Sequence, residues 1–82
     1  MLKILYFAQL RDTLNCSEEN LGWQTHFNTI DDVKTVLSQR DEKWQKAFNK
    51  NILSALNQQM AQGHREIKEG DEIAFFPPVT GG

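Results

Sequence analysis

The chain has 82 residues, of which 39% are hydrophobic and 24% charged, and its formal net charge is −2. This length allows one small domain, and the charge, without a basic stripe interleaved with aromatic side chains, argues against a nucleic-acid-binding surface. The single cysteine cannot form an internal disulfide. The apolar start of the chain is too short to span a bilayer and lacks the flanks of a signal peptide. We therefore expect a cytoplasmic protein without nucleic-acid or membrane partners.

The first half of the chain predicts two strands and a helix. Residues 2–9 are rich in apolar and aromatic side chains and indicate a strand, residues 11–17 are polar and indicate a turn, and residues 18–27 form a weaker candidate strand. Thr29 can then cap a helix whose positive first turn contains Asp31–Asp32. The apolar stripe of this helix consists of Ile30, Val33, Val36 and Leu37.

The second half predicts a short helix and two strands. Residues 41–48 indicate the helix, residues 52–57 a short strand, residues 59–65 an irregular segment, and residues 72–76 the final strand. Pro77 ends this strand because it cannot donate a ladder hydrogen bond. The order indicates an α+β fold in which a mixed sheet clasps one main helix, with the first and last strands as central, parallel neighbours.

The two faces of this sheet are not equally covered in this interpretation. A single helix covers only one face, whereas the first strand carries large apolar side chains on both. Leu5 and Phe7 on this strand, with Phe75 or Phe76 on the last, cannot all be buried beneath the helix. We expect an exposed apolar patch on the far face, which is the usual mark of a partner surface. The alternative is that Phe7 and Phe75 are ordinary core aromatics, because alternation fixes the faces only when the register is right.

The sequence ends in PPVTGG. Glycine costs more backbone entropy to order than any other residue, so we expect a domain of residues 1–76 and a flexible tail of residues 77–82. Lacking Cβ atoms, Gly81–Gly82 can enter a narrow slot and present the α-carboxylate of Gly82 to another protein's active site. That carboxylate is ionised and a poor electrophile at neutral pH. Because the chain has no phosphate-binding glycine motif, its activation requires a separate enzyme.

These features resemble the sulfur-carrier (small) subunit of molybdopterin synthase, a ubiquitin-like sulfur-carrier family. The resemblance rests on residues 6–11 (YFAQLR), on Leu56-Asn57-Gln58 and, most specifically, on residues 69–82 (EGDEIAFFPPVTGG). It implies a ubiquitin-like β-grasp fold in which four to five strands clasp one main helix and a short second helix. It also implies that family interface positions fall on Phe7, Met60 and Phe75.

The resemblance further implies a reaction route. Gly82 is adenylated with ATP-Mg by a ubiquitin-activating-type enzyme and converted, with sulfur from a donor protein, to a thiocarboxylate. The tail, including Thr80 and Gly81, then enters the large subunit, where sulfur passes to cyclic pyranopterin monophosphate. The expected assembly has two small and two large subunits. The chain would bind no cofactor or metal and would be non-catalytic alone.

Other interpretations are a thiamine-pathway sulfur carrier, a ubiquitin-like modifier conjugated through Gly82, and a plain binding module with an incidental tail. Cys16 could be a sulfur-relay thiol, but it has no CxxC partner or nearby base, so we interpret it as a bystander. His26 and His64 lack metal-ligand spacing and are expected on the surface. Arg11 matches the family without an assigned role, and we expect Trp23 and Trp44 to fill the core or its rim.

Overall fold

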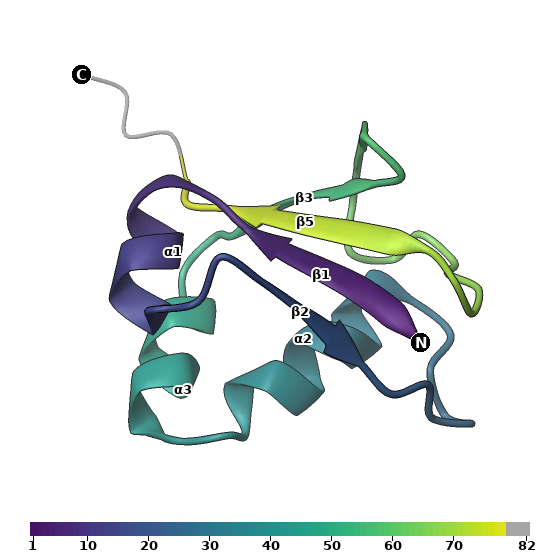
Figure 1. Ribbon diagram of the computed structural model, residues 1–82, viewed down its shortest axis with the longest axis horizontal. Coiled ribbons are helices and arrows are strands. Elements are labelled where there is room, and N and C mark those ends of the chain that lie inside the picture. Colours follow the sequence, from purple (N-terminus) through teal and green to yellow (C-terminus); the bar gives the residue numbers. More distant parts are fainter. Residues whose placement is uncertain (79–82) are drawn as a thin grey trace.

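A five-stranded mixed sheet in the order β2-β1-β5-β3-β4 forms one layer of the computed structural model, which describes residues 1–78. The predictions for Thr80, Gly81 and Gly82 lie outside these residues. The strands are β1 (Leu2–Tyr6), β2 (Glu18–Leu21), β3 (Leu53–Leu56), β4 (Gln59–Ala61) and β5 (Glu72–Phe76). The helices are α1 (Ala8–Leu14), α2 (Ile30–Ser38) and α3 (Glu42–Phe48). Figure 1 shows α2 and α3 on one side of the sheet and α1 at the end where β1 finishes.

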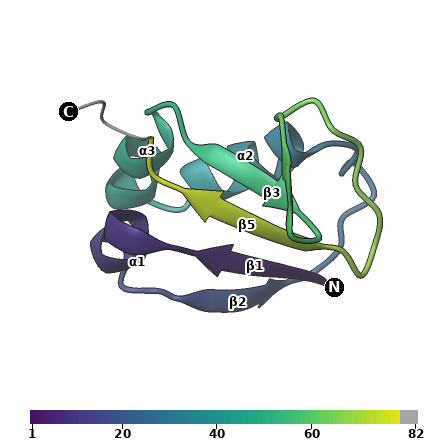
Figure 2. The ribbon, with the colours of Figure 1, turned by 90° about the horizontal axis from the view of Figure 1, so that it is seen from above.

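The first and last strands are parallel neighbours, as predicted. Tyr6 of β1 lies opposite Phe75 of β5 in the register, and β5 also pairs antiparallel with β3. Strand β5 is therefore hydrogen-bonded on both sides at the centre of the sheet, between β1 and β3 (Figure 2).

The core fills the space between the sheet and the helices. Its largest wholly buried side chains come from β1, α2 and β5: Leu2, Ile4, Tyr6, Ile30, Val33, Leu37, Ile73 and Phe75. Trp44 is also buried and Trp23 packs partly buried against the core, as expected. Burial of these apolar side chains is the main favourable contribution to the stability of the fold.

Both predicted helices begin at capping residues, of which Thr29 was recognised from the sequence and Asp41 was not. At the start of α2, Asp32 Oδ2 accepts hydrogen bonds from the backbone N–H groups of Asn28 (2.8 Å) and Thr29 (2.9 Å). These bonds lower the pKa of Asp32 because they stabilise its ionised form. At the start of α3, Asp41 Oδ1 accepts from the N–H of Trp44 at 3.1 Å. The capping side chains thus satisfy backbone donors that a helix start leaves without partners.

The predicted turn at residues 11–17 is wrong, because most of this segment belongs to α1. Leu10 and Leu14 lie one helical turn apart and are both buried, so the packing of these two side chains stabilises a short helix. The polar residues around them made the segment look like a turn in the sequence. The strand predicted over residues 2–9 consequently ends at Tyr6, and the chain enters α1 directly.

The segment predicted as irregular at residues 59–65 begins with a short strand. Asn57 and Gln58 both have positive φ, at 49° and 72°, and they form the two-residue turn that joins β3 to β4. Asn57 also accepts a hydrogen bond from the N–H of Glu72 at 2.9 Å. This bond fixes the hairpin against β5.

Candidate functional site

The exposed apolar side chains of the sheet gather on the side away from the helices. We call this the far-face surface and define it as Phe7, Leu53, Met60 and Phe76. Phe7 and Leu53 are each 39% exposed, Met60 is 64% exposed, and Phe76 is half-buried. Leu53 of β3 lies opposite Phe76 of β5 in the register. With Met60 from β4 and Phe7 at the end of β1, the surface includes side chains from four neighbouring parts of the sheet. Apolar side chains clustered in this way are typical of a partner surface.

Two aromatic pairs lie on opposite sides of the sheet at the ends of β1 and β5. On the core side, the rings of Tyr6 and Phe75 are 6.2 Å apart. On the far face, the rings of Phe7 and Phe76 are 4.9 Å apart and nearly parallel, with 9° between their planes. The arrangement follows from strand geometry, since consecutive side chains point to opposite faces and the two strands are parallel and in register.

The expectation that Phe75 presents its side chain on the far face is wrong. Phe75 has no exposed surface and packs edge-on against Phe48 of α3, with ring centroids 5.2 Å apart. Its neighbour Phe76 occupies the far face. Sequence reasoning allowed either residue, because two consecutive phenylalanines do not indicate which one faces the helix.

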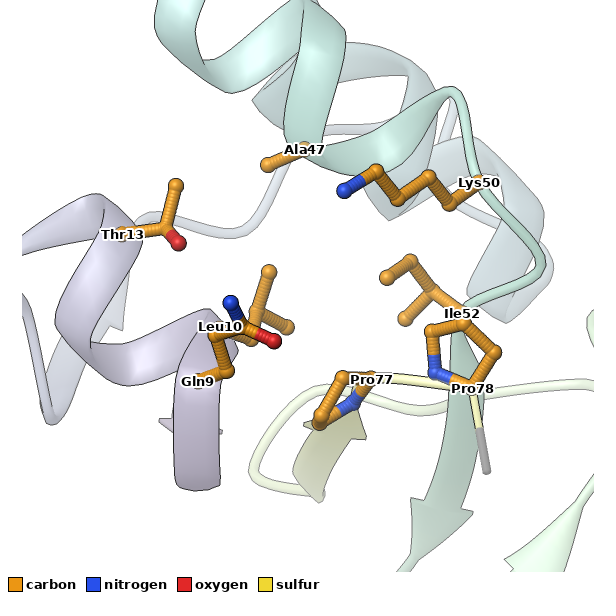
Figure 3. Close-up of a pocket in the computed structure, with 8 residues that line it drawn as sticks. All are labelled: Gln9, Leu10, Thr13, Ala47, Lys50, Ile52, Pro77 and Pro78. Atoms are coloured by element: carbon orange, nitrogen blue, oxygen red, sulfur yellow. The ribbon is translucent and has the colours of Figure 1, made fainter. Parts of the chain in front are cut away.

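The start of the tail lies between two hollows. An open hollow of about 590 Å³ is lined on the far face by Ala8, Gln9, Leu53, Met60, Phe76, Pro77 and Pro78. A smaller one of about 170 Å³ lies between α1, the end of α3 and β3, and is lined by Gln9, Leu10, Thr13, Ala47, Lys50, Ile52, Pro77 and Pro78 (Figure 3). Pro77 and Pro78 line both hollows, so the tail starts at the edge of the far-face surface.

A polar cluster on the opposite side of the sheet was not predicted. The Tyr6 hydroxyl donates to Glu19 Oε2 at 2.7 Å, and the Arg40 guanidinium donates to both Glu19 oxygens at 2.7 and 2.6 Å. Burial, followed by the hydrogen bond to Glu19, raises the pKa of Tyr6 well above its usual range. These residues are far apart in the sequence, and no spacing rule could have brought them together.

Cys16 has the environment of an unreactive thiol. Its Sγ is 3.6 Å from the carbonyl oxygen of Glu18, and burial, followed by the negative charge of Glu19, raises the pKa of Cys16. A raised pKa reduces the thiolate that a sulfur relay requires. This agrees with the interpretation of Cys16 as a bystander.

The remaining candidate side chains are at the surface. His26 and His64 are exposed, as expected, and Arg11 lies 3.6 Å from Asp12 in an exposed pair. Within residues 1–78, no group of three or more His, Cys, Asp or Glu side chains is placed to hold a metal ion. None of the helices in the described part of the chain is long and apolar enough to cross a membrane.

The mixed sheet wrapped on α2 is the ubiquitin-like β-grasp fold, as predicted. SAMP1 from Haloferax volcanii has the same fold, with a TM-score of 0.78 and 22% identity over 99% of this chain and 98% of that chain. A chain from the complex of subunits 1 and 2 of molybdopterin-converting factor from Helicobacter pylori 26695 also matches. Its TM-score is 0.68, with 21% identity over 99% of this chain and 97% of that chain. At these identities the likeness shows the fold alone.

The sequence narrows this class to a family. The chain belongs to the ThiS family, whose model matches residues 4–82. It is 42% identical over 83 residues to the molybdopterin synthase sulfur carrier subunit of Haemophilus influenzae and 32% identical to that of Escherichia coli (strain K12), in both cases over the whole of both chains. The resemblance recognised from the sequence is thereby confirmed.

Proposed function

We propose that this protein is the sulfur carrier of molybdopterin synthase, with the α-carboxylate of Gly82 as the group that carries sulfur. The observation that carries the proposal is the 42% identity, along the whole of both chains, with the sulfur carrier subunit of Haemophilus influenzae. The position of Pro77 and Pro78 beside the far-face surface supports it, because a partner that docks there would receive the residues that follow.

The proposed route has two stages. In the first, a carboxylate oxygen of Gly82 bonds to the α-phosphorus of ATP and pyrophosphate leaves. A sulfur nucleophile at the oxidation level of sulfide then displaces AMP from the acyl carbon, which leaves a thiocarboxylate. In the second, the thiocarboxylate sulfur bonds to an oxygen-bearing carbon of cyclic pyranopterin monophosphate as the carbon–oxygen bond breaks, and the oxygen leaves as water or with the phosphate. Water cleaves the resulting thioester, so that the substrate keeps the sulfur and the Gly82 carboxylate returns.

Both stages need partners. The complex of subunits 1 and 2 of molybdopterin-converting factor supports a large subunit as one partner, and we propose an assembly of two small and two large subunits. A ubiquitin-activating-type enzyme, which uses ATP-Mg, and a sulfur donor protein are the others. We propose that the far-face surface docks on the large subunit through Phe7, Met60 and Phe76, the last in place of Phe75. One tail cannot occupy two active sites, so binding of the large subunit and of the activating enzyme should be mutually exclusive.

The mass of the protein isolated from its host tests the proposal. We expect a fraction heavier by the difference between one sulfur and one oxygen atom, with the difference located at Gly82 by fragmentation. A variant that lacks Gly82 is the control and should show only the unmodified mass. Isopeptide adducts through Gly82 without any thiocarboxylate would instead indicate a protein modifier and overturn the proposal.

A further inference from the structure

Ala8 adopts a backbone conformation that alanine rarely takes. Its φ is 54°, in the left-handed region, although it is the first residue of α1. The Cβ atom makes this region unfavourable for any residue except glycine, and asparagine tolerates it better than alanine does. Asn15, Asn57 and Gln58 also have positive φ, but they lie at a helix C-cap and a two-residue hairpin turn, where this conformation is common. The conformation of Ala8 therefore calls for an explanation from its surroundings.

The hydrogen bonds of Phe7 explain why residue 8 must turn in this way. The N–H of Phe7 donates to the carbonyl of Phe75 at 3.1 Å, which keeps Phe7 joined to the end of β5. The carbonyl of Phe7 accepts from the N–H of Arg11 at 3.3 Å, which is the first turn of α1. Phe7 is thus the single residue between β1 and α1, and it is joined to the sheet and caps the helix. The change of direction falls on Ala8.

The same geometry sets the position of the Phe7 ring. Because the backbone of Phe7 is fixed on both sides, its ring lies flat against Phe76 with 4.9 Å between centroids. The ring is nevertheless 39% exposed, and Ala8 itself lines the far-face hollow beside Pro77. An exposed aromatic side chain that is already ordered loses less entropy when a partner covers it.

We propose that Ala8 is a positioning residue for partner docking: its left-handed conformation holds the Phe7 ring parallel to Phe76 before the large subunit binds. The inference rests on the proposed function, since it concerns the same far-face surface. Glycine at this position would remove the unfavourable contact of the Cβ atom, but it would also allow other backbone conformations. The turn that joins the two hydrogen bonds of Phe7 would then be less rigid, and its ring could move away from Phe76 more readily.

The substitution Ala8→Gly tests the inference in two assays. In the free protein, we expect an unchanged or higher urea midpoint, together with weakened nuclear Overhauser contacts between the Phe7 and Phe76 rings. With the purified large subunit of molybdopterin synthase from the same organism, we expect the Kd to rise roughly three- to tenfold, the effect of ordering one side chain. Asn15→Gly, at the other end of α1 and away from the far face, is the matched control and should leave the Kd unchanged.

A double-mutant cycle separates positioning from a general structural effect. In a Phe7→Ala background, Ala8→Gly should cause no further loss of affinity, because the ring it positions is gone. Asparagine tolerates the left-handed conformation, so Ala8→Asn should keep the ring contacts and the wild-type Kd. If Ala8→Gly does not fold, loss of the ring contacts in Ala8→Asn would overturn the inference. An unchanged Kd for Ala8→Gly, or an equal loss without Phe7, would overturn the inference. If the wild-type protein does not bind the large subunit, the proposed docking fails, and the ring contacts in the free protein alone decide whether Ala8 positions Phe7.

Discussion

Arg40 and Glu19 form a two-point contact between elements that are distant in the sequence. The Nη1 and Nη2 atoms of Arg40 donate to Oε2 and Oε1 of Glu19, at 2.7 and 2.6 Å. The guanidinium also lies 4.5 Å from the centroid of the Trp44 ring. The contact therefore ties β2, an edge strand, to the segment between α2 and α3. Bidentate pairs of this kind fix orientation as well as contributing energy.

The contact between Glu19 and Arg40 predicts that the free energy of unfolding depends on pH. Burial alone would raise the pKa of Glu19, but hydrogen bonds from Arg40 and Tyr6, with the charge of Arg40, hold it below its usual range. A lowered pKa in the folded state means that the stability contributed by Glu19 is complete above the unfolded-state pKa of about 4.3 and is lost as pH falls through the folded-state value. We expect Glu19→Gln to lower the free energy of unfolding at pH 7 by about 1–3 kcal/mol and to flatten its decline in acid.

Urea unfolding of both proteins between neutral pH and pH 3 provides the measurement. Glu18→Gln is the control, because Glu18 is exposed and its carboxylate lies 3.8 Å from Lys3 Nζ, where a surface pair contributes little. An acid decline in Glu19→Gln as steep as that of the wild type would contradict the assignment.

The consecutive residues Phe75 and Phe76 predict opposite effects. Phe75→Ala should lower the free energy of unfolding by about 3–5 kcal/mol, because it opens a cavity in the core. Phe76→Ala should cost less stability and should mainly weaken binding to the large subunit, since its burial is completed only in the complex. Urea unfolding and calorimetric titration separate the two effects. Equal losses of stability would show that Phe76 is also part of the core.

The fold could be predicted largely because its central elements have strong local signals. The final strand was predicted with its observed bounds, and Thr29 marked the start of α2, because proline and capping side chains act through local backbone chemistry. Helix α1 was missed because it is short and its two buried leucines stand among polar residues. Its stability comes from tertiary packing, which no local pattern records.

The candidate site was predictable in kind but not in each residue. The excess of aromatic side chains indicated an exposed far face, and Phe7 and Met60 are exposed there. The choice between Phe75 and Phe76 required the register of β1 against β5. The Glu19–Arg40 contact joins residues 21 positions apart and required the full fold.

Cys16 should be dispensable and slow to react. Because its pKa is raised by burial and by the charge of Glu19, less thiolate is present at neutral pH. We expect iodoacetamide to alkylate Cys16 in the folded protein more slowly than in urea, and Cys16→Ser to carry sulfur at the wild-type rate. Loss of sulfur transfer in Cys16→Ser, with an unchanged urea midpoint, would assign this thiol a role in the relay.

The terminal glycines should matter for transfer and not for folding. Both lie beyond the described residues, so this prediction rests on the sequence. Deleting Gly82 should abolish sulfur transfer and leave the urea midpoint unchanged, since it shortens the reach of the carboxylate by roughly 3.5 Å. Gly81→Ala should slow adenylation and transfer roughly tenfold if a narrow slot excludes the added methyl group. Wild-type rates for Gly81→Ala in both assays would show that no such slot exists.

The central place of β5 has a mechanical consequence. This strand leads directly to Pro77 and Pro78 and is hydrogen-bonded to β1 on one side and to β3 on the other. A force along the axis of β5 therefore shears its pairing with both neighbouring strands, and the hydrogen bonds on the two sides must break together. An edge strand would instead be peeled away one bond at a time. We therefore expect the domain to resist a force applied at its carboxyl end better than it would if β5 lay at the edge of the sheet.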